Sequence, residues 1–252
     1  MLNYDELADA ARMKRLSLVN AEKDYLQDVV LLSIYSHVGD ELVFKGGTCL
    51  YKVFGLNRFS EDLDFTLAGK VGVDDLADKI VRDIGLLNMK GAVKETKKYA
   101  NEINVRMIFN GPLYNGGRET QCFIPLNISL REKPVYGAKR ETIKSMYTEI
   151  PDFDVFAMHE EEILAEKVRA VMTRNKPRDV YDLWFLLKRG MTINREAVNR
   201  KLKPYDLAFD TEKLLLEIKR KRQLWNMDLR NLVIGKLPDF DEVVEQIEGG
   251  LY

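Results

Sequence analysis

Cysteine and histidine are scarce in this sequence, with two residues of each among 252. Cys49 and Cys122 lack the spacing of a metal-binding pair, and no histidine stands in a pattern that would activate either thiol as a nucleophile. So few cysteines are typical of a reducing compartment. No apolar run reaches the ~18 residues that a membrane-spanning helix needs, and the first residues do not resemble a signal peptide. These absences predict a cytoplasmic protein without a membrane partner.

An excess of one charge is missing too. Lysine and arginine together number 39 and aspartate and glutamate 40, so the formal net charge is −1. Without a global positive field, a nucleic-acid partner would have to bind a local basic patch. The densest basic run, residues 219–222, is most simply a solvated helix face, although it could also bind an RNA backbone.

The sequence does contain regular apolar patterns, and 46% of its residues are hydrophobic, enough for a full core. Strands flanked by helices predict a mixed α/β domain over residues 1–150, and a helical pattern from Asp154 predicts a helical C-terminal domain over residues 151–252. The expected elements are helices at 21–37 and 74–87, a short helix that contains Leu50 and ends at Gly55, strands at 42–44 and 63–67, a hairpin of strands at 103–109 and 124–130, and helix breaks near Pro177, Gly190 and Pro204.

Two short motifs of the first domain carry the chemistry. The first is Lys45-Gly46-Gly47-Thr48, a turn of small residues that ends in a hydroxyl and follows a predicted strand. The second is Ser60-Glu61-Asp62-Leu63-Asp64, in which one apolar residue separates two carboxylates. Backbone amides can hold phosphates, and paired carboxylates can hold divalent cations. Together the motifs predict a site for a nucleoside triphosphate (NTP) and metal ions.

The spacing of the two carboxylates suits a strand. If Leu63 and Phe65 point into a core, the two-residue period places Asp62 and Asp64 on the opposite face, about 7 Å apart along the strand. Carboxylates at that separation can share a pair of hard cations such as Mg²⁺. The same spacing is also common in strand edges and loops that bind nothing.

Two residues of the second domain have both a structural and a functional interpretation. Lys167 stands within the apolar stripe of a predicted helix, so its ammonium group either reaches back to water or offsets charge on a phosphoryl group. Asp179 comes near the start of the next helix, where it either complements the helix dipole or takes part in a site. These residues alone leave both interpretations open.

Five segments occur along the chain in a specific order: Glu22-Lys23-Asp24-Tyr25-Leu26, Phe44-Lys45-Gly46-Gly47-Thr48, Arg58-Phe59-Ser60-Glu61-Asp62-Leu63-Asp64-Phe65, Glu166-Lys167, and Lys176-Pro177-Arg178-Asp179-Val180-Tyr181-Asp182-Leu183. Together they resemble the AbiEii/AbiGii toxin family of nucleotidyltransferases, from about Glu22 to Lys188. The resemblance implies a DNA polymerase β-type nucleotidyltransferase domain followed by a helical domain. It also implies an NTP substrate with Mg²⁺, two ions being expected, a toxin role with an antitoxin encoded nearby, and, for some members, a tRNA end as the acceptor.

The resemblance also implies a role for each candidate residue. Lys45, Gly46, Gly47, Thr48 and Ser60 would bind the nucleotide, Asp62 and Asp64 would be catalytic metal ligands, and Lys167 and Asp179 would complete the catalytic site. The sequence departs from the family at Asn127, where members often have a carboxylate that takes the proton of the attacking hydroxyl. An amide cannot take a proton. Either Asp179, oriented by Arg178, or Glu102 would then be the base, or the metal acts alone, or activity is weak.

The sequence therefore predicts a Mg²⁺-dependent nucleotidyltransferase that transfers a nucleoside monophosphate from an NTP to an RNA end. Two alternatives remain open. One is a metal-dependent phosphodiesterase or nuclease, because two carboxylates and two cations also serve hydrolysis. The other is a nucleotide- or RNA-binding module in which Asn127 has weakened catalysis.

Overall fold

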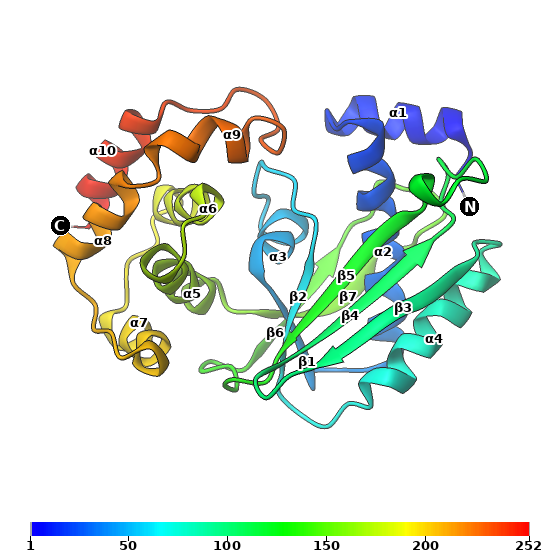
Figure 1. Ribbon diagram of the computed structural model, residues 1–252, viewed down its shortest axis with the longest axis horizontal. Helices are drawn as coiled ribbons and strands as arrows, with labels where there is room; N and C mark the ends of the chain where they lie inside the picture. The colour runs from blue at the N-terminus through cyan, green and yellow to red at the C-terminus, as the bar shows by residue number, and fades with distance from the viewer. Residues whose placement is uncertain (1, 252) are drawn as a thin grey trace. The chain divides into compact units, whose positions relative to one another are not determined.

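The computed structural model describes residues 2–251, which form two compact units (Figure 1). The first unit contains the described chain up to Gly55 and then Phe59–Met158. The second contains Leu56–Arg58 and the described chain from His159 onward. The domain boundary expected near residue 150 falls just before the last strand of the first unit.

A mixed sheet of seven strands forms the centre of the first unit, in the order β3-β4-β5-β2-β1-β7-β6. Strands β2 and β5 are parallel, as are β1 and β7, and the other neighbouring strands are antiparallel. The predicted mixed α/β class and the predicted β4–β5 hairpin are confirmed. The strands are β1 (Leu42–Lys45), β2 (Leu63–Leu67), β3 (Gly91–Lys98), β4 (Glu102–Phe109), β5 (Cys122–Ser129), β6 (Ala138–Ile143) and β7 (Phe153–Met158).

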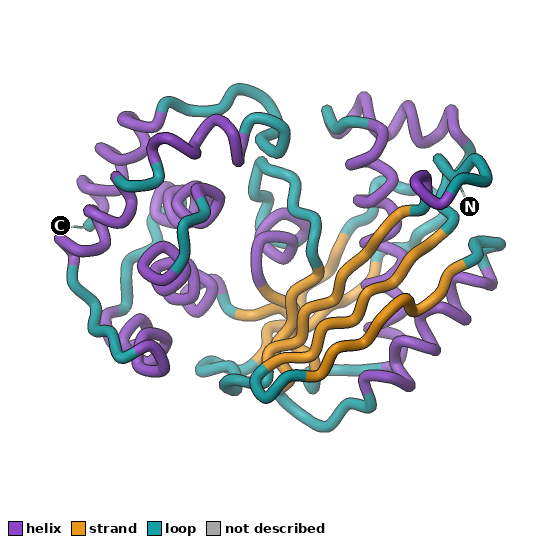
Figure 2. Tube along the Cα trace, in the orientation of Figure 1, coloured by secondary structure: helices purple, strands orange, loops and turns teal. Residues whose placement is uncertain are grey.

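Two helices, α2 (Leu18–His37) and α4 (Val73–Leu86), pack against one face of this sheet (Figure 2). Phe65 on β2 and Ile128 on β5 are neighbours in the register, and both are fully buried. Alternate strand residues therefore build a core under the helices, while the residues between them form a polar face. Two further helices are α1 (Tyr4–Lys14) and α3 (Gly46–Lys52), the latter following β1 directly.

Three strands and one helix of the first unit, namely β3, β6, β7 and α1, are absent from the sequence prediction. Strand β3 lies at an edge of the sheet and has exposed lysines, including Lys94, instead of a clear apolar alternation. Strand β7 occupies residues where a helical pattern was expected from Asp154 onward. That expectation was wrong, because Phe153, Val155 and Ala157 alternate as buried residues of a strand.

The second unit consists of helices and short 3₁₀ turns in its described part, so the predicted helical character is confirmed from Glu160 onward. Pro177 occupies the first turn of α6, and Gly190 follows its end with φ of +84°. No helix among residues 2–251 has the length and hydropathy to cross a membrane. The α-helices are α5 (Glu160–Thr173), α6 (Pro177–Lys188), α7 (Arg195–Leu202), α8 (Thr211–Lys219), α9 (Trp225–Leu229) and α10 (Phe240–Gly250).

Candidate functional site

The turn between β1 and α3 packs directly against a carboxylate of β2. Lys45 is the register partner of Asp64 on the antiparallel neighbour strand. Gly46 adopts a positive φ of +76°, and a Cβ at this position would lie 2.5 Å from Oδ2 of Asp64. Both features require glycine, since other residues strain in this region and would push the carboxylate away. The two motifs found in the sequence therefore lie in direct contact.

The two carboxylates of the second motif differ in exposure. Asp62 immediately precedes β2 and is exposed, whereas Asp64 lies within the strand and is half-buried. Leu63, between them, is fully buried, which is the alternation that the sequence predicted. The pair therefore lies on the polar face of the sheet, next to the glycine turn.

Thr48 takes a different place from the one expected for a phosphate ligand. Its side chain is fully buried, and its hydroxyl donates a hydrogen bond to the backbone carbonyl of Asp62. The hydroxyl thus fixes the residue before β2. Gly46 remains the residue of the turn that packs directly against the Asp64 carboxylate.

Asn127 lies beside Asp64 in the parallel register of β2 and β5, and its amide Nδ2 donates a 3.0 Å hydrogen bond to Asp64 Oδ1. Asn127 therefore restrains the carboxylate and offers no proton acceptor on that side. The alternative acid, Glu102, is opposite Ser129, two residues along β5 from Asn127. Its carboxylate oxygens accept from Asn104 at 3.3 Å and pair with Arg131 at 3.4 Å.

Helix α2 supports the carboxylate motif through residues that sequence reasoning did not assign. The buried amide of Gln27 donates to the backbone carbonyls of Ser60 at 2.8 Å and Glu61 at 3.0 Å. Lys23 also pairs with the Glu61 side chain at 3.3 Å. Ser60 thus lies in the anchored segment that leads into β2. The signal available in the sequence was the helical spacing of Lys23 and Gln27 on one face.

The same helix holds α3 through a buried ionic cluster. Lys52, at the end of α3, contacts Asp24 and Asp28 of α2, each at 2.6 Å. Asp24 also pairs with Lys14 and accepts from the Tyr147 hydroxyl at 2.7 Å. Burial alone would raise the pKa of Asp24, but the ammonium groups of Lys52 and Lys14 outweigh burial and lower it to about 2. Helix α2 therefore anchors both halves of the site.

Hard oxygen donors of this site fit a divalent cation. Asp62 and Asp64 supply carboxylates next to the glycine turn, and the absence of a side chain at Gly46 lets the turn backbone approach Asp64 Oδ2. No cluster of three or more Asp, Glu, His or Cys side chains suited to a metal occurs among residues 2–251. Mg²⁺ sites with one or two carboxylates are usually completed by water and substrate phosphates. The residues present therefore fit a metal that arrives with a nucleotide.

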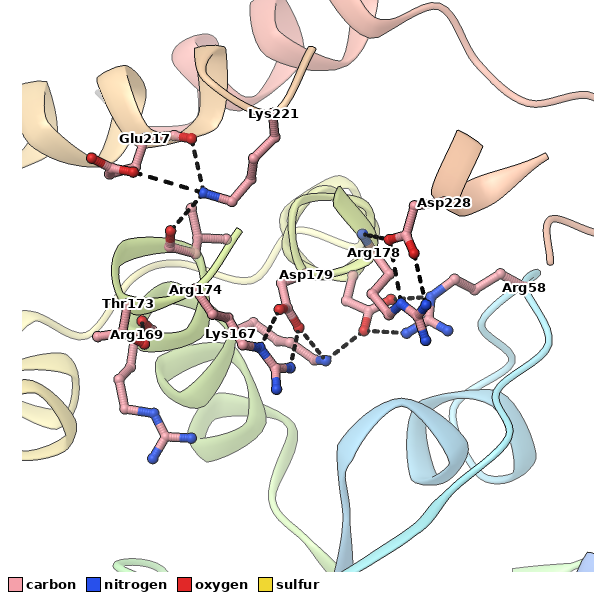
Figure 3. Close-up of polar contacts among 12 residues, drawn as sticks. Arg58, Lys167, Arg169, Thr173, Arg174, Arg178, Asp179, Glu217, Lys221 and Asp228 are labelled. Carbon is pink, nitrogen blue, oxygen red and sulfur yellow. Dashed lines mark hydrogen bonds and ion pairs between the residues drawn. The ribbon is translucent and has the colours of Figure 1, made fainter. Parts of the chain in front are cut away.

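In the second unit, Lys167 and Asp179 meet in a buried ion-pair cluster (Figure 3). Lys167 Nζ lies 3.0 Å from Asp179 and 2.6 Å from Asp182. Arg58 binds both oxygens of Asp182, and Arg174 binds both oxygens of Asp179. The ammonium group of Lys167 thus does not reach back to water. Burial alone would lower its pKa, but Asp182 and Asp179 raise it, so Lys167 stays charged.

The cluster favours a positioning role for Asp179 over a base. Burial would raise the pKa of Asp179, yet Lys167 and Arg174 hold it below its ordinary value, so the carboxylate is a weak proton acceptor. The cations that bind its oxygens are Lys167 and Arg174. The guanidinium and backbone N–H of Arg178 donate to Asp228 of α9, with the shortest contact at 2.7 Å.

The basic run at 219–222 has three exposed side chains, Lys219, Arg220 and Arg222, and one buried side chain, Lys221. Lys221 is 1% exposed and donates to the backbone carbonyls of Val171 and Glu217 (Figure 3). Its neighbours have acidic partners: Lys219 pairs with Glu248, Arg220 with Glu217, and Arg222 with Asp241. The Lys219 and Arg222 pairs connect this segment to α10, whereas the Arg220 pair stays within the same segment. The expectation of a solvated face therefore holds for three of the four residues, and the buried Lys221 departs from it.

Comparison with known proteins adds a family to this geometry. Residues 30–246 match the family described as nucleotidyl transferase AbiEii toxin, Type IV TA system. The chain belongs to this family. The resemblance seen in the sequence is confirmed, and this AbiEii protein is a nucleotidyltransferase of a toxin–antitoxin family. No curated protein is similar enough to the chain to count as a match.

Solved structures share the fold of this AbiEii protein. MenT4, a nucleotidyltransferase toxin from Mycobacterium tuberculosis, superimposes with a TM-score of 0.69 at 18% identity, covering 99% of this chain and 88% of its own. JHP933 from Helicobacter pylori gives a TM-score of 0.59 at 22% identity, covering 93% of this chain and 91% of its own. A further H. pylori protein, described as a putative nucleotidyltransferase, gives 0.61 at 22% identity, covering 93% of this chain and 94% of its own. At such identities the likeness shows the fold.

Proposed function

We propose that this nucleotidyltransferase transfers a nucleoside monophosphate from an NTP to an RNA end, with a tRNA end as the first candidate, in a reaction that depends on Mg²⁺. In the cell it would act as a toxin restrained by an antitoxin, in keeping with its family. The single observation that carries the proposal is the contact of the Gly46 turn with Asp64, which joins a phosphate-binding turn to a carboxylate pair.

Each residue of the first unit has a task in this proposal. Backbone amides of Gly46 and Gly47 bind the outgoing phosphates, and Lys45 adds positive charge beside them. Asp62 and Asp64 would hold two Mg²⁺ ions. When bound, such ions lower the pKa of the attacking hydroxyl and offset charge on the leaving pyrophosphate. Gln27 and Thr48 keep the carboxylate motif in place, and Asn127 keeps Asp64 oriented.

Lys167 and Asp179 would complete the site, with Lys167 offsetting charge on the transferring phosphoryl group. Asp179 and Asp182 hold its ammonium group charged and fixed. Since both oxygens of Asp179 already accept from cations, the proton of the attacking hydroxyl leaves to solvent or to a substrate phosphate.

Label transfer tests the proposal. Each NTP, labelled at the α-phosphate, is incubated with total RNA and Mg²⁺, and the RNA is separated on a denaturing gel. Labelled RNA is expected with wild type and not with Asp64→Asn, whereas Asp78→Asn, an exposed acid on α4, serves as the matched control. RNA that shortens without gaining label would show a nuclease instead.

The hydrogen bond from Asn127 to Asp64 favours one second candidate, a binding module with little catalysis. Such a module would bind NTP with Mg²⁺ but release no pyrophosphate with any RNA fraction. Calorimetric NTP binding together with a pyrophosphate assay separates it from the transferase.

A further inference from the structure

A pocket of about 660 Å³ opens on the first unit where β4 ends and β5 begins. Its lining residues belong neither to the glycine turn nor to the carboxylate motif. Two aromatic rings and two cations dominate its lining. The residues that matter are Lys94, Ile108, Tyr114, Arg118, Gln121 and Phe123.

The pocket shares the polar face of the sheet with the carboxylate site. Ile108 is the register partner of Phe123, and Phe123 precedes Asn127 by four positions in the same strand. Even spacing places Phe123 and Asn127 on the same face, about 13 Å apart at ~3.3 Å per residue. Since α2 and α4 pack on the opposite face, one ligand lying along β5 can reach both Phe123 and Asp64 (Figure 1).

The two cations of the pocket have no counter-charge of their own. Lys94 and Arg118 are exposed, and neither makes an ion pair with the residues that the structure describes. Lys94 is the extra residue of a β-bulge, because the register with β4 shifts between Val93 and Glu95. A third cation, Arg106, lies over the Phe123 ring at 5.9 Å. Positive charge beside an aromatic ring is the combination that binds single-stranded nucleic acid.

The loop that brings Tyr114 and Arg118 to the pocket contains several internal hydrogen bonds. Tyr114 donates from its hydroxyl to the Gly116 carbonyl at 3.2 Å, and the hydroxyl of Thr120 donates to Gly117 O at 2.8 Å. The base of the loop is fastened to α2, where the buried Glu22 accepts from the Leu113 N–H at 2.7 Å. A preformed pocket binds at a lower cost in ordering entropy.

The direction of the reaction indicates which substrate occupies this side. In the register, the glycine turn lies on the β1 side of Asp64 and Asn127 on the β5 side. In-line transfer places the attacking oxygen and the leaving pyrophosphate on opposite sides of the α-phosphorus. If the triphosphate lies at the turn, the acceptor therefore approaches over β5, in the direction of the pocket.

We infer that this pocket binds the acceptor as single-stranded RNA, near the end that receives the nucleotide. A base stacks on the Phe123 and Tyr114 rings, and Lys94 and Arg118 contact its backbone phosphates. The inference rests on the proposed function for the role of the RNA, while the binding itself can be measured without any transfer.

Binding of a fluorescein-labelled single-stranded RNA dodecamer to the full chain, followed by anisotropy, tests the pocket. Phe123→Ala should weaken binding by about 5- to 150-fold, the range for loss of one stacked base. Lys94→Gln and Arg118→Gln should each lower the slope of log K against log salt by about 0.7, as expected for one lost phosphate contact on a single strand. The controls are Tyr99→Ala and Lys70→Gln, which remove an exposed ring and a lysine elsewhere in the unit.

The outcomes separate this inference from the proposed function. Pocket variants that lose RNA binding but keep wild-type NTP binding would support it, even if wild type transfers no label to RNA. The two exposed cation variants guard against a folding defect in Phe123→Ala. RNA affinity and salt slope equal to wild type in all three pocket variants would overturn the inference. Transfer of label to a protein acceptor in place of RNA would instead contradict the proposed function.

Discussion

Gly46→Ala is the sharpest test of the site, because the chain contains its own control. Gly46 and Gly55 both have φ of +76°. A Cβ at Gly46 would meet the Asp64 carboxylate at 2.5 Å, whereas a Cβ at Gly55 would meet nothing within 4 Å. The two alanine variants therefore share the backbone strain and differ in their effect on Asp64.

The expected magnitudes follow from these contacts. Each variant should lose about 1–2 kcal/mol of unfolding free energy from the left-handed backbone. In Gly46→Ala, the carboxylate or the turn must also move by about 0.9 Å, the difference between the 3.4 Å of ordinary contact and 2.5 Å. A displacement of ~1 Å in a reacting site can cost on the order of 10²-fold in rate. The Asn127 hydrogen bond to Asp64 would be strained, adding about 0.5–1.5 kcal/mol.

Urea unfolding and single-turnover transfer from labelled NTP measure the two quantities. We expect similar midpoints for both variants, with Gly46→Ala somewhat lower, and a rate loss of about 10²-fold in Gly46→Ala alone. Rates that agree within about threefold would refute the reasoning, because Asp64 would then not need its place beside the turn. A rate loss in both variants would point to backbone strain as the cause.

Three further predictions concern two buried lysines, Asn127 beside Asp64, and the buried Asp24. Lys167→Met and Lys201→Met each remove a buried lysine with two acidic partners, so both variants should lose about 3–5 kcal/mol of unfolding free energy. Only Lys167→Met should also lower the turnover of the folded fraction, by roughly 10²-fold or more. Equal turnover in the two variants would make Lys167 a packing residue. Asn127→Asp should replace the hydrogen bond to Asp64 by repulsion between two carboxylates and so lower stability without Mg²⁺. With Mg²⁺ it should speed transfer by up to ~10² to 10⁴-fold if a carboxylate base is limiting. A single-turnover rate unchanged from wild type between pH 6 and 9 would show that the enzyme needs no base at this position. Because the folded-state pKa of Asp24 is depressed to about 2, its ion pairs should stabilise the first unit fully above about pH 4 and lose that effect as pH falls towards 2. The thermal unfolding midpoints of wild type and Asp24→Asn should therefore converge over that range. A constant difference between the two midpoints would contradict the assigned charge.

The sequence by itself determined the parts of the site that depend on local periodicity. The two-residue period of a strand placed Asp62 and Asp64 opposite the buried Leu63, and the same period marked the β4–β5 hairpin. The small residues after a predicted strand marked the turn at Gly46 and Gly47, although its contact with Asp64 came only from the structure. The family also followed from the order of short motifs along the chain.

Only the tertiary structure decided which partners the polar side chains contact. A helical period gives the face on which Lys167 lies, but not the carboxylates packed against that face. Arg178 binds Asp228, fifty residues away in the chain, and Lys221 enters the core to reach Val171. Such pairs form because burying a charge without a partner is costly, so the packing of distant helices selects the partner. Neither period nor composition contains that information.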